Sequence, residues 1–217
     1  IYQNKTFINK IKSLLGDDFY LYASRIICGV PNSIIPSWIN KELDLKTLNL
    51  GIFIRPEYRD IRYFHGIDYH MDMIDLPNEY SDILTVYIYL DHVGKEMSPL
   101  LLLPGSHYGG TDVYPHNLCE EKNSIKYQPQ NNDSITVEPY ALEGESSDAW
   151  LWHGCLIHGT KVNKSTKPRY SIRLIYRKSA NTSHAYIDEV NKKIKNVIAL
   201  EKMTDISRFD NPNQYSH

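Results

Sequence analysis

The feature that most constrains the fold is a series of about eight short β-rich runs between residues 17 and 177, with no helical pattern among them. Gly, Pro, Asn and Asp separate the runs, as is typical of strands joined by turns. Strands without intervening helices cannot build βαβ units, so the series predicts a β-sandwich or barrel. We therefore expect an all-β core with a jelly-roll architecture, that is, a double-stranded β-helix. The runs are DFYLYASRIICGV, LNLGIFI, RYFHGIDYHMDM, ILTVYIYL, PLLLLP, SITVEPY, DAWLWHGCLIH and RYSIRLIYR.

Two segments outside this series have the apolar spacing of amphipathic helices. Residues 5–15 (KTFINKIKSLL) carry apolar side chains at helical intervals, and Gly16 follows as a stop. Residues 187–202 (IDEVNKKIKNVIALEK) show a similar pattern, with lysines on the other face. We expect both helices to flank the sheets. A chain of 217 residues without an interdomain linker fits one domain spanning residues 1–217.

Charge and composition exclude several classes of partner. The formal net charge of -2 provides no field that would attract nucleic acid. No apolar run approaches the roughly 18 to 20 residues needed to cross a bilayer, so we expect no membrane insertion. The three cysteines Cys28, Cys119 and Cys155 are an odd number without CxxC spacing, which indicates free thiols in a reducing compartment. We expect a cytoplasmic protein.

His70 and Asp72 form the first half of a candidate metal site. They are two positions apart in a strand-like run, and alternate side chains of a strand project to the same side. An imidazole, a carboxylate and a distant second imidazole make up the facial triad that binds iron(II) and leaves positions open for other ligands. By itself a His-x-Asp pair arises readily by chance, so it needs support from elsewhere in the chain.

Three histidines compete for the place of the second imidazole: His107, His153 and His158. His158 is followed eleven positions later by Arg169, with Asn163 between them, and this spacing favours His158. A residue after Pro-Gly-Ser, such as His107, more often fastens a turn than binds a metal. His153 differs from His158 in strand parity, although a turn at Gly154 would remove that distinction.

Arg169 is a candidate for holding a carboxylate beside the metal. Its planar guanidinium suits bidentate pairing with one end of a dicarboxylate. Arg169, Ser171 and Arg173 share one face of the strand-like run RYSIRLIYR, whereas Tyr170 and Ile172 lie on the other. The competing interpretation is an arginine at a strand start that pairs with a surface acid, and the sequence leaves both open.

A Pro-Gly-Ser-His turn at residues 104–107 completes a pattern with an ordered spacing. The chain reads YHMD, then ILTVYIYLD, then PGSH, then HGTKVNKSTKPR. This arrangement, over roughly residues 62–177, resembles the phytanoyl-CoA dioxygenase family of iron(II)- and 2-oxoglutarate-dependent oxygenases. The resemblance implies that dioxygen and 2-oxoglutarate are consumed to hydroxylate a small-molecule substrate. It also implies that Asp72 favours hydroxylation, because halogenating relatives have a small residue at that position.

The resemblance further implies a set of binding residues. The iron(II) ligands would be His70, Asp72 and His158. The distal carboxylate of 2-oxoglutarate would be bound by Arg169 and Ser171. In the family, the strand after the first ligands also helps to hold 2-oxoglutarate, which makes Thr85 and Tyr87 further candidates. They lie on one face with Tyr89, and a purely structural ladder of tyrosines would explain this face equally well.

Two further features and one alternative function remain. Residues 108–147 are polar and lie between two core strands, so we expect a mobile lid over the site. Arg55, Arg59 and Arg62 precede the metal strand and could receive an anionic substrate, although a solvated charged run is the simpler interpretation. The alternative is a cupin-like jelly roll that binds a metal or a small molecule without oxygenase activity. The sequence does not determine the oligomeric state.

Overall fold

The computed structural model describes residues 4–38, 61–64, 66–75, 81–112, 116–130, 132–179 and 185–194. The strand expected in the run LNLGIFI and the second part of the expected C-terminal helix, from residue 195 on, lie outside these ranges. Arg55, Arg59 and the side chain of Arg62 lie outside them as well.

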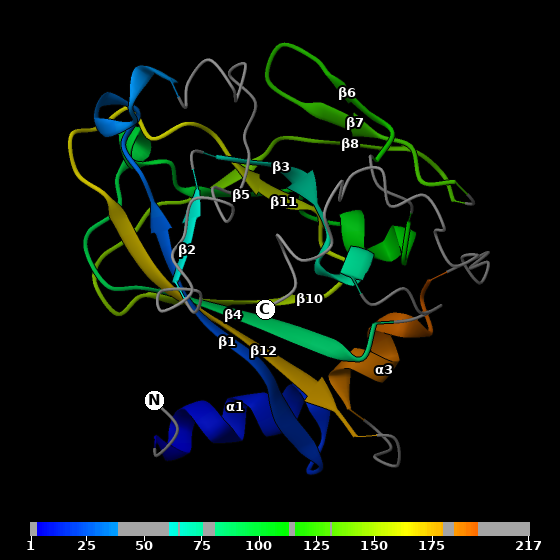
Figure 1. Cartoon of the computed structure of the whole chain (residues 1–217). Coiled ribbons are helices and arrows are strands. Elements are labelled where there is room, and N and C mark those ends of the chain that lie inside the picture. The colour runs from blue at the N-terminus through cyan, green and yellow to red at the C-terminus, as the bar shows by residue number, and fades with distance from the viewer. Residues whose placement is uncertain are drawn as a thin grey trace.

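Two facing β-sheets form the core, as expected for a jelly roll (Figure 1). Neighbouring strands are antiparallel, except that β1 and β2 run parallel. The larger sheet has the order β10 (Ala149–His153), β4 (Ile83–Tyr89), β12 (Arg169–Lys178), β1 (Phe19–Gly29) and β2 (Ile61–Phe64). The smaller sheet has the order β3 (Ile67–His70), β11 (His158–Thr160), β5 (Leu100–Leu102) and β9 (Tyr140–Leu142). The all-β core and the jelly-roll architecture are therefore confirmed.

Strand β4 is buried on both faces along its whole length. Leu84, Val86 and Ile88 lie on its outer face, where they pack against the helices. Thr85 and Tyr87 lie on the inner face, toward the smaller sheet, because side chains alternate along a strand. One strand thus separates the packing of the helices from the interior between the sheets.

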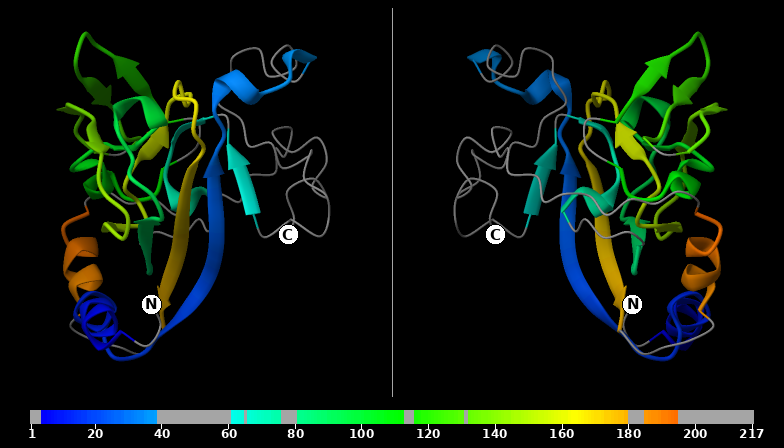
Figure 2. Two further views of the ribbon diagram at one scale, coloured as in Figure 1. Left: turned by 90° about the vertical axis from the view of Figure 1, so that its left-hand side faces the viewer. Right: turned by 90° about the vertical axis from the view of Figure 1, so that its right-hand side faces the viewer.

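Helices α1 (Lys5–Leu15) and α3 (Tyr186–Asn191) cover the outer face of the larger sheet (Figures 1 and 2). The bounds of α1 agree with the expected helix, and Asn4 caps it by accepting a hydrogen bond of 3.1 Å from the Phe7 amide. The expected second helix begins one residue earlier than predicted. Its first turns pack through Ile187 into the same apolar cluster as α1.

Residues 108–147 contain more strands than the one run, SITVEPY, that the sequence predicted there. A third sheet consists of β6 (Leu118–Glu120), β7 (Ile125–Tyr127) and β8 (Ile135–Val137), and β9 joins the smaller core sheet. Ile125 and Tyr127 are buried against the core, an alternation that the surrounding polar residues obscure in the sequence. The segment's role as a lid stays a prediction.

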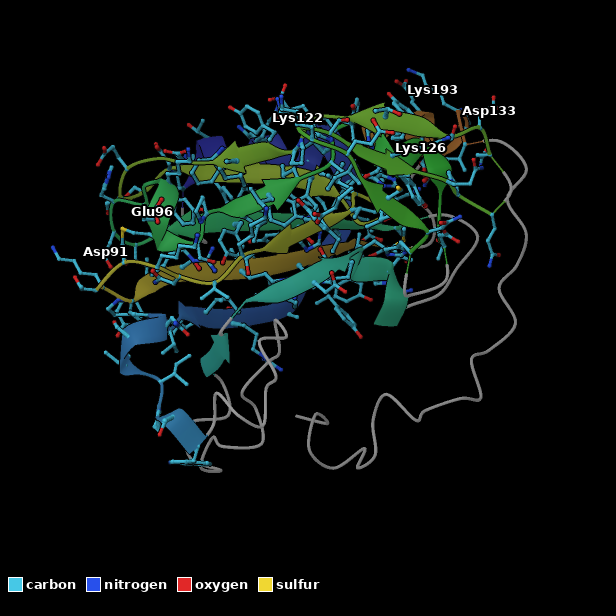
Figure 3. The ribbon with its side chains drawn as sticks, turned by 90° about the horizontal axis from the view of Figure 1, so that it is seen from above. Asp91, Glu96, Lys122, Lys126, Asp133 and Lys193 are labelled. Atoms are coloured by element: carbon cyan, nitrogen blue, oxygen red, sulfur yellow. The ribbon has the colours of Figure 1, made fainter. Side chains whose placement is uncertain are left out.

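Short 3-10 helices complete the described structure, and many of the charged side chains are exposed. The labelled lysines and acidic residues in Figure 3 lie at the rim of the molecule and are exposed. Among the described residues, no helix combines the length and apolar character needed to cross a bilayer. The 3-10 helices are η1 (Asn32–Ile34), η4 (Asp72–Asp75), η5 (Lys95–Met97) and η6 (Ser106–Gly109).

Replacing Leu174 with alanine should destabilise the fold strongly. Leu174 is 1% exposed on β12 and belongs to the cluster between the larger sheet and the helices. We expect Leu174→Ala to lower the free energy of unfolding by about 2 to 5 kcal/mol, because it removes buried methyl groups and leaves a cavity. Chemical denaturation measures this loss. Leu90→Ala, at a position 41% exposed, is the control, and an equal loss in both variants would contradict the assignment of this core.

Candidate metal centre and cosubstrate site

His70, Asp72 and His158 come together between the two sheets. One ligand atom from each lies within 4.8 Å of the others. His70 ends β3 and His158 begins β11, and the two are direct partners in the antiparallel ladder, with ring centroids 4.5 Å apart. The expectation that His70 and Asp72 share a strand is wrong, because β3 ends at His70 and Asp72 begins η4. The turn of η4, and not strand alternation, brings the carboxylate to the imidazoles.

The residue after the distal histidine, Gly159, allows β11 to approach β3 closely. A Cβ atom at Gly159 would lie 3.0 Å from the carbonyl oxygen of Ile67 and 3.1 Å from the amide nitrogen of Tyr69, both of them backbone atoms of β3. Backbone atoms of a paired strand cannot move aside as a flexible side chain can. Glycine at this position therefore permits the pairing that sets His158 opposite His70.

The Pro-Gly-Ser-His turn fixes the chain just before His158. Gly105 has a φ of 88°, which glycine adopts without strain. The turn places the buried Ser106 so that its hydroxyl accepts a hydrogen bond of 2.8 Å from the amide of Ile157. Ile157 in turn accepts a hydrogen bond of 2.9 Å from the Leu103 amide. The motif thus acts on the metal centre through the backbone next to His158.

Both histidines present the same ring nitrogen to the centre. Nδ1 of His70 lies 2.8 Å from the carbonyl oxygen of Asp68, and Nδ1 of His158 lies 2.9 Å from that of Leu156. A carbonyl can only accept a hydrogen bond, so each Nδ1 carries the proton and each Nε2 keeps its lone pair. Burial, followed by the neighbouring His158, lowers the pKa of His70 to about 3, and burial also lowers the pKa of His158. Both rings are neutral near pH 7, as metal ligation requires.

The two oxygens of Asp72 have different surroundings. Oδ2 accepts a hydrogen bond of 2.5 Å from the Thr85 hydroxyl and one of 3.3 Å from Nε1 of Trp152. Oδ1 lies 3.7 Å from Nε2 of His158 and forms an ion pair with Nη2 of Arg173. The carboxylate is thereby oriented with Oδ1 toward the imidazole of His158.

Asp72 carries a negative charge although its side chain is fully buried. Burial by itself raises the pKa of this carboxyl, but Arg173 and the two histidines lower it by more, so the pKa ends below its ordinary range. Two neutral imidazoles and one ionised carboxylate oxygen are the donor set of the iron(II) facial triad, and they suit a divalent metal. The centre can therefore hold iron(II) with three ligands on one side.

Arg169 lies inside the molecule, at the start of β12. It is 1% exposed, so the alternative interpretation as a partner of a surface acid is wrong. Its Nη1 donates to the carbonyl oxygen of Ser98, and its buried Nε has no hydrogen-bond partner among the described residues. A buried guanidinium with unused hydrogen-bonding capacity fits an anionic ligand that binds beside it.

The other expected cosubstrate residues lie on the same inner face. Ser171 donates a hydrogen bond of 2.7 Å to the Tyr87 hydroxyl, and the guanidinium carbon of Arg169 lies 5.8 Å from the centroid of the Tyr87 ring. Thr85 instead contacts Asp72. Arg169, Ser171 and Tyr87 are therefore contiguous, whereas Thr85 belongs to the metal side of the site.

The competing histidines have other roles. Nδ1 of His153 accepts a hydrogen bond of 3.2 Å from the Cys155 amide, so Nε2 carries the proton and donates to Oδ1 of Asn191 at 3.0 Å. His153 thereby connects the end of β10 to α3. His107 lies beside His153, with ring centroids 5.7 Å apart, and does not join the metal centre.

Three contributors to the site were missed by the sequence reasoning. Trp152 and Arg173 contact Asp72, and Ser106 holds the backbone of Ile157. Arg173 had a usable signal, since it shares a strand face with Arg169 and Ser171. Trp152 had none, because its contact depends on how β10 pairs with β4.

Stability of the metal-free protein should depend on pH through His153. Burial, followed by the neighbouring His107, lowers the pKa of His153 to about 4, against about 6.5 for an unfolded histidine. Between these values the unfolded chain binds the proton and the folded chain does not, so acidification favours unfolding. We expect the melting temperature in a chelator to fall from pH 7 to pH 5, and to fall less steeply in His153→Gln. Equal slopes in both proteins would contradict this role.

Comparisons with known proteins identify the family of this chain and relatives of its fold. A model of the phytanoyl-CoA dioxygenase (PhyH) family matches residues 59–171. A probable alpha-ketoglutarate-dependent hypophosphite dioxygenase from Stutzerimonas stutzeri is 28% identical over 113 residues, or 51% of this chain and 39% of that protein. The structure of the apo non-heme monooxygenase ThoJ has a TM-score of 0.53 at 12% identity and covers 82% of this chain and 54% of its own. The nickel complex of ThoJ has a TM-score of 0.50 at 12% identity, with coverages of 82% and 52%.

These matches differ in what they support. The chain spans only 39% of its curated relative and about half of ThoJ, and the likeness to ThoJ concerns the fold. The name of the curated relative agrees with the cosubstrate expected from the sequence, 2-oxoglutarate, and the donor set agrees with iron(II). The family model covers more than half of the chain. The chain therefore belongs to the phytanoyl-CoA dioxygenase family.

Proposed function

We propose that this chain is an iron(II)- and 2-oxoglutarate-dependent dioxygenase that hydroxylates a C–H bond of a small molecule. The observation that carries the proposal is the convergence of His70, Asp72 and His158, with both Nδ1 atoms committed to backbone carbonyls. That commitment turns both Nε2 lone pairs to one point. These three residues would be the iron ligands, and Trp152 and Thr85 would hold Asp72 so that Oδ1 binds the metal.

Arg169 would bind the distal carboxylate of 2-oxoglutarate, with help from Ser171 and Tyr87. Its buried guanidinium gives the site a fixed positive charge in a region that water does not reach. Thr85 would contribute through Asp72 and not through the cosubstrate. A cupin-like protein without oxygenase activity has no need of a buried guanidinium at this place, which favours the oxygenase.

The proposed reaction balances without a further reductant. Iron(II), when bound, would supply the redox chemistry that couples the two substrates to dioxygen. 2-Oxoglutarate loses carbon dioxide and becomes succinate with one oxygen atom of O2, and the other oxygen atom enters the C–H bond as a hydroxyl. The protein binds and orients both substrates, and burial of the centre excludes water from the side of Asp72. Asp72 occupies a position that a halide would need, which favours hydroxylation.

Residues 108–147 would cover the substrate, and the chain would act as one domain. Ile125 and Tyr127 of this segment pack with Met71 and Met73, which flank Asp72. A change in the position of this segment would therefore reach the metal centre directly. The cytoplasmic location stays a prediction from the cysteines, of which Cys28 and Cys155 are buried and Cys119 is exposed.

Cosubstrate binding tests the proposal. Anaerobic titration of the iron(II)-loaded protein with 2-oxoglutarate should produce the weak visible charge-transfer band of a chelated 2-oxo acid. Arg169→Gln should weaken 2-oxoglutarate binding roughly 10- to 100-fold, because it removes a hydrogen-bonded charge pair. Arg177→Gln is the control, since Arg177 lies on the same strand and pairs with Asp82. Absence of the band in the wild type would count against the oxygenase.

Metal binding tests the choice of the third ligand. His158→Ala should lose iron(II) or cobalt(II) binding, because it removes one of three donors, as measured by metal content after desalting under nitrogen. His153→Gln should retain the metal, since His153 binds Asn191 and Cys155 instead. Metal loss in the His153 variant with retention in the His158 variant would refute the assignment.

A further inference from the structure

Arg173 contacts the metal centre and is partly exposed. It lies on β12 two positions after Ser171, and its Nη2 contacts Oδ1 of Asp72, the oxygen that lies 3.7 Å from Nε2 of His158. The Asp72 side chain is fully buried, whereas that of Arg173 is 28% exposed. The guanidinium therefore lies between the buried carboxylate and the outside.

A second arginine lies next to Arg173. Arg25 of β1 is its direct partner in the antiparallel ladder, so the two side chains share the inner face of the sheet. Arg25 is partly buried, and its Nη1 donates to the carbonyl oxygen of Ser24 at 2.9 Å. Arg25 and Arg173 therefore lie side by side on the face of the sheet from which Arg173 contacts Asp72.

A metal ion would change the partner of Arg173. A metal cation held by Asp72 would compete with Arg173 for the carboxylate, because the two positive charges would repel each other. The buried Nε of Arg173 already has no hydrogen-bond partner among the described residues. Leaving a partly buried guanidinium without a carboxylate partner costs free energy, and another anion in the place of the carboxylate would remove that cost.

We propose that Arg173, with Arg25 beside it, binds an oxyanion of the substrate on the open side of the metal centre. This inference rests on the proposed function and names the substrate class: a small carboxylate or a phosphorus oxyacid. Arg173 and Arg169 are four positions apart on β12, or about 13 Å along an extended strand. The two arginines thus serve different anions, Arg169 the distal carboxylate of 2-oxoglutarate and Arg173 the substrate.

The position of Arg173 also limits how far the reacting C–H bond can lie from the anionic group. The same guanidinium that would hold the oxyanion contacts a metal ligand in the metal-free protein. An anion held there lies next to the metal, so the C–H bond that reacts is within a few bonds of the anionic group. The substrate is therefore oxidised near its charged end.

Ligand binding to the cobalt(II)-substituted protein tests this inference without turnover. The protein is loaded with cobalt(II) and 2-oxoglutarate under nitrogen and titrated with acetate, methylphosphonate or the neutral acetamide, with the visible cobalt spectrum and calorimetry as readouts. We expect binding of an anion and none of acetamide, and the comparison of acetate with methylphosphonate distinguishes a carboxylate from a phosphorus oxyacid. Arg173→Gln should weaken anion binding about tenfold or more and leave 2-oxoglutarate binding within about twofold.

Two further variants complete the test. Arg25→Gln should weaken anion binding by a smaller factor than Arg173→Gln does. Arg177→Gln should bind the anion as the wild type does, because Arg177 pairs with Asp82 farther along the strand. Without 2-oxoglutarate, Arg173→Gln should bind cobalt(II) more tightly than the wild type, since the competing cation is gone.

The possible failures are distinguishable. Wild-type protein that binds neither cobalt(II) nor 2-oxoglutarate refutes the proposed function. The role of Arg173 is refuted, and the proposed function is not, if cobalt(II) and 2-oxoglutarate bind normally but the protein binds no anion. The same holds if the anion binds equally well to Arg173→Gln and to the wild type. Loss of 2-oxoglutarate binding in Arg173→Gln would show that this arginine binds the cosubstrate. Weaker cobalt(II) binding in the same variant would show that it positions Asp72. Either result also overturns the inference.

Discussion

The close pairing of β11 with β3 is the constraint on which the candidate site depends. It sets His158 directly opposite His70, and Gly159 is the residue that lets the two backbones approach. Ser106 then fixes the neighbouring Ile157 amide, so the position of His158 is determined from both sides. The metal centre is thus a product of backbone pairing, and side-chain packing only refines it.

Much of the fold could be predicted from the sequence, because it depends on local signals. The alternation along β4 and the apolar spacing of α1 are visible in the residues themselves. Predictions failed where a turn replaced a strand, as at Asp72, and where short strands were hidden among polar residues, as at Ile125 and Tyr127. Those outcomes depend on what the segment packs against, which a local pattern does not contain.

The metal and cosubstrate residues could be proposed from spacing, but their partners could not. The pairing of β12 with β1 and β4 decides that Arg173 meets Arg25 and Tyr87, and the sequence carries no record of that register. The fully buried Asp72 illustrates the cost of such a site. Its charge is tolerated because Arg173, Thr85 and Trp152 surround it, and a fold selected for stability alone would place apolar groups there.

Strand β4 carries two unrelated tasks on its two faces. Val86 and its outward neighbours hold the helices, whereas Thr85 and Tyr87 line the site. Substitutions on the inner face can therefore alter chemistry while the contacts that keep α1 and α3 in place remain the same. Related proteins that share this strand can change their substrate without first gaining a higher free energy of unfolding, because selection acts largely independently on the two faces.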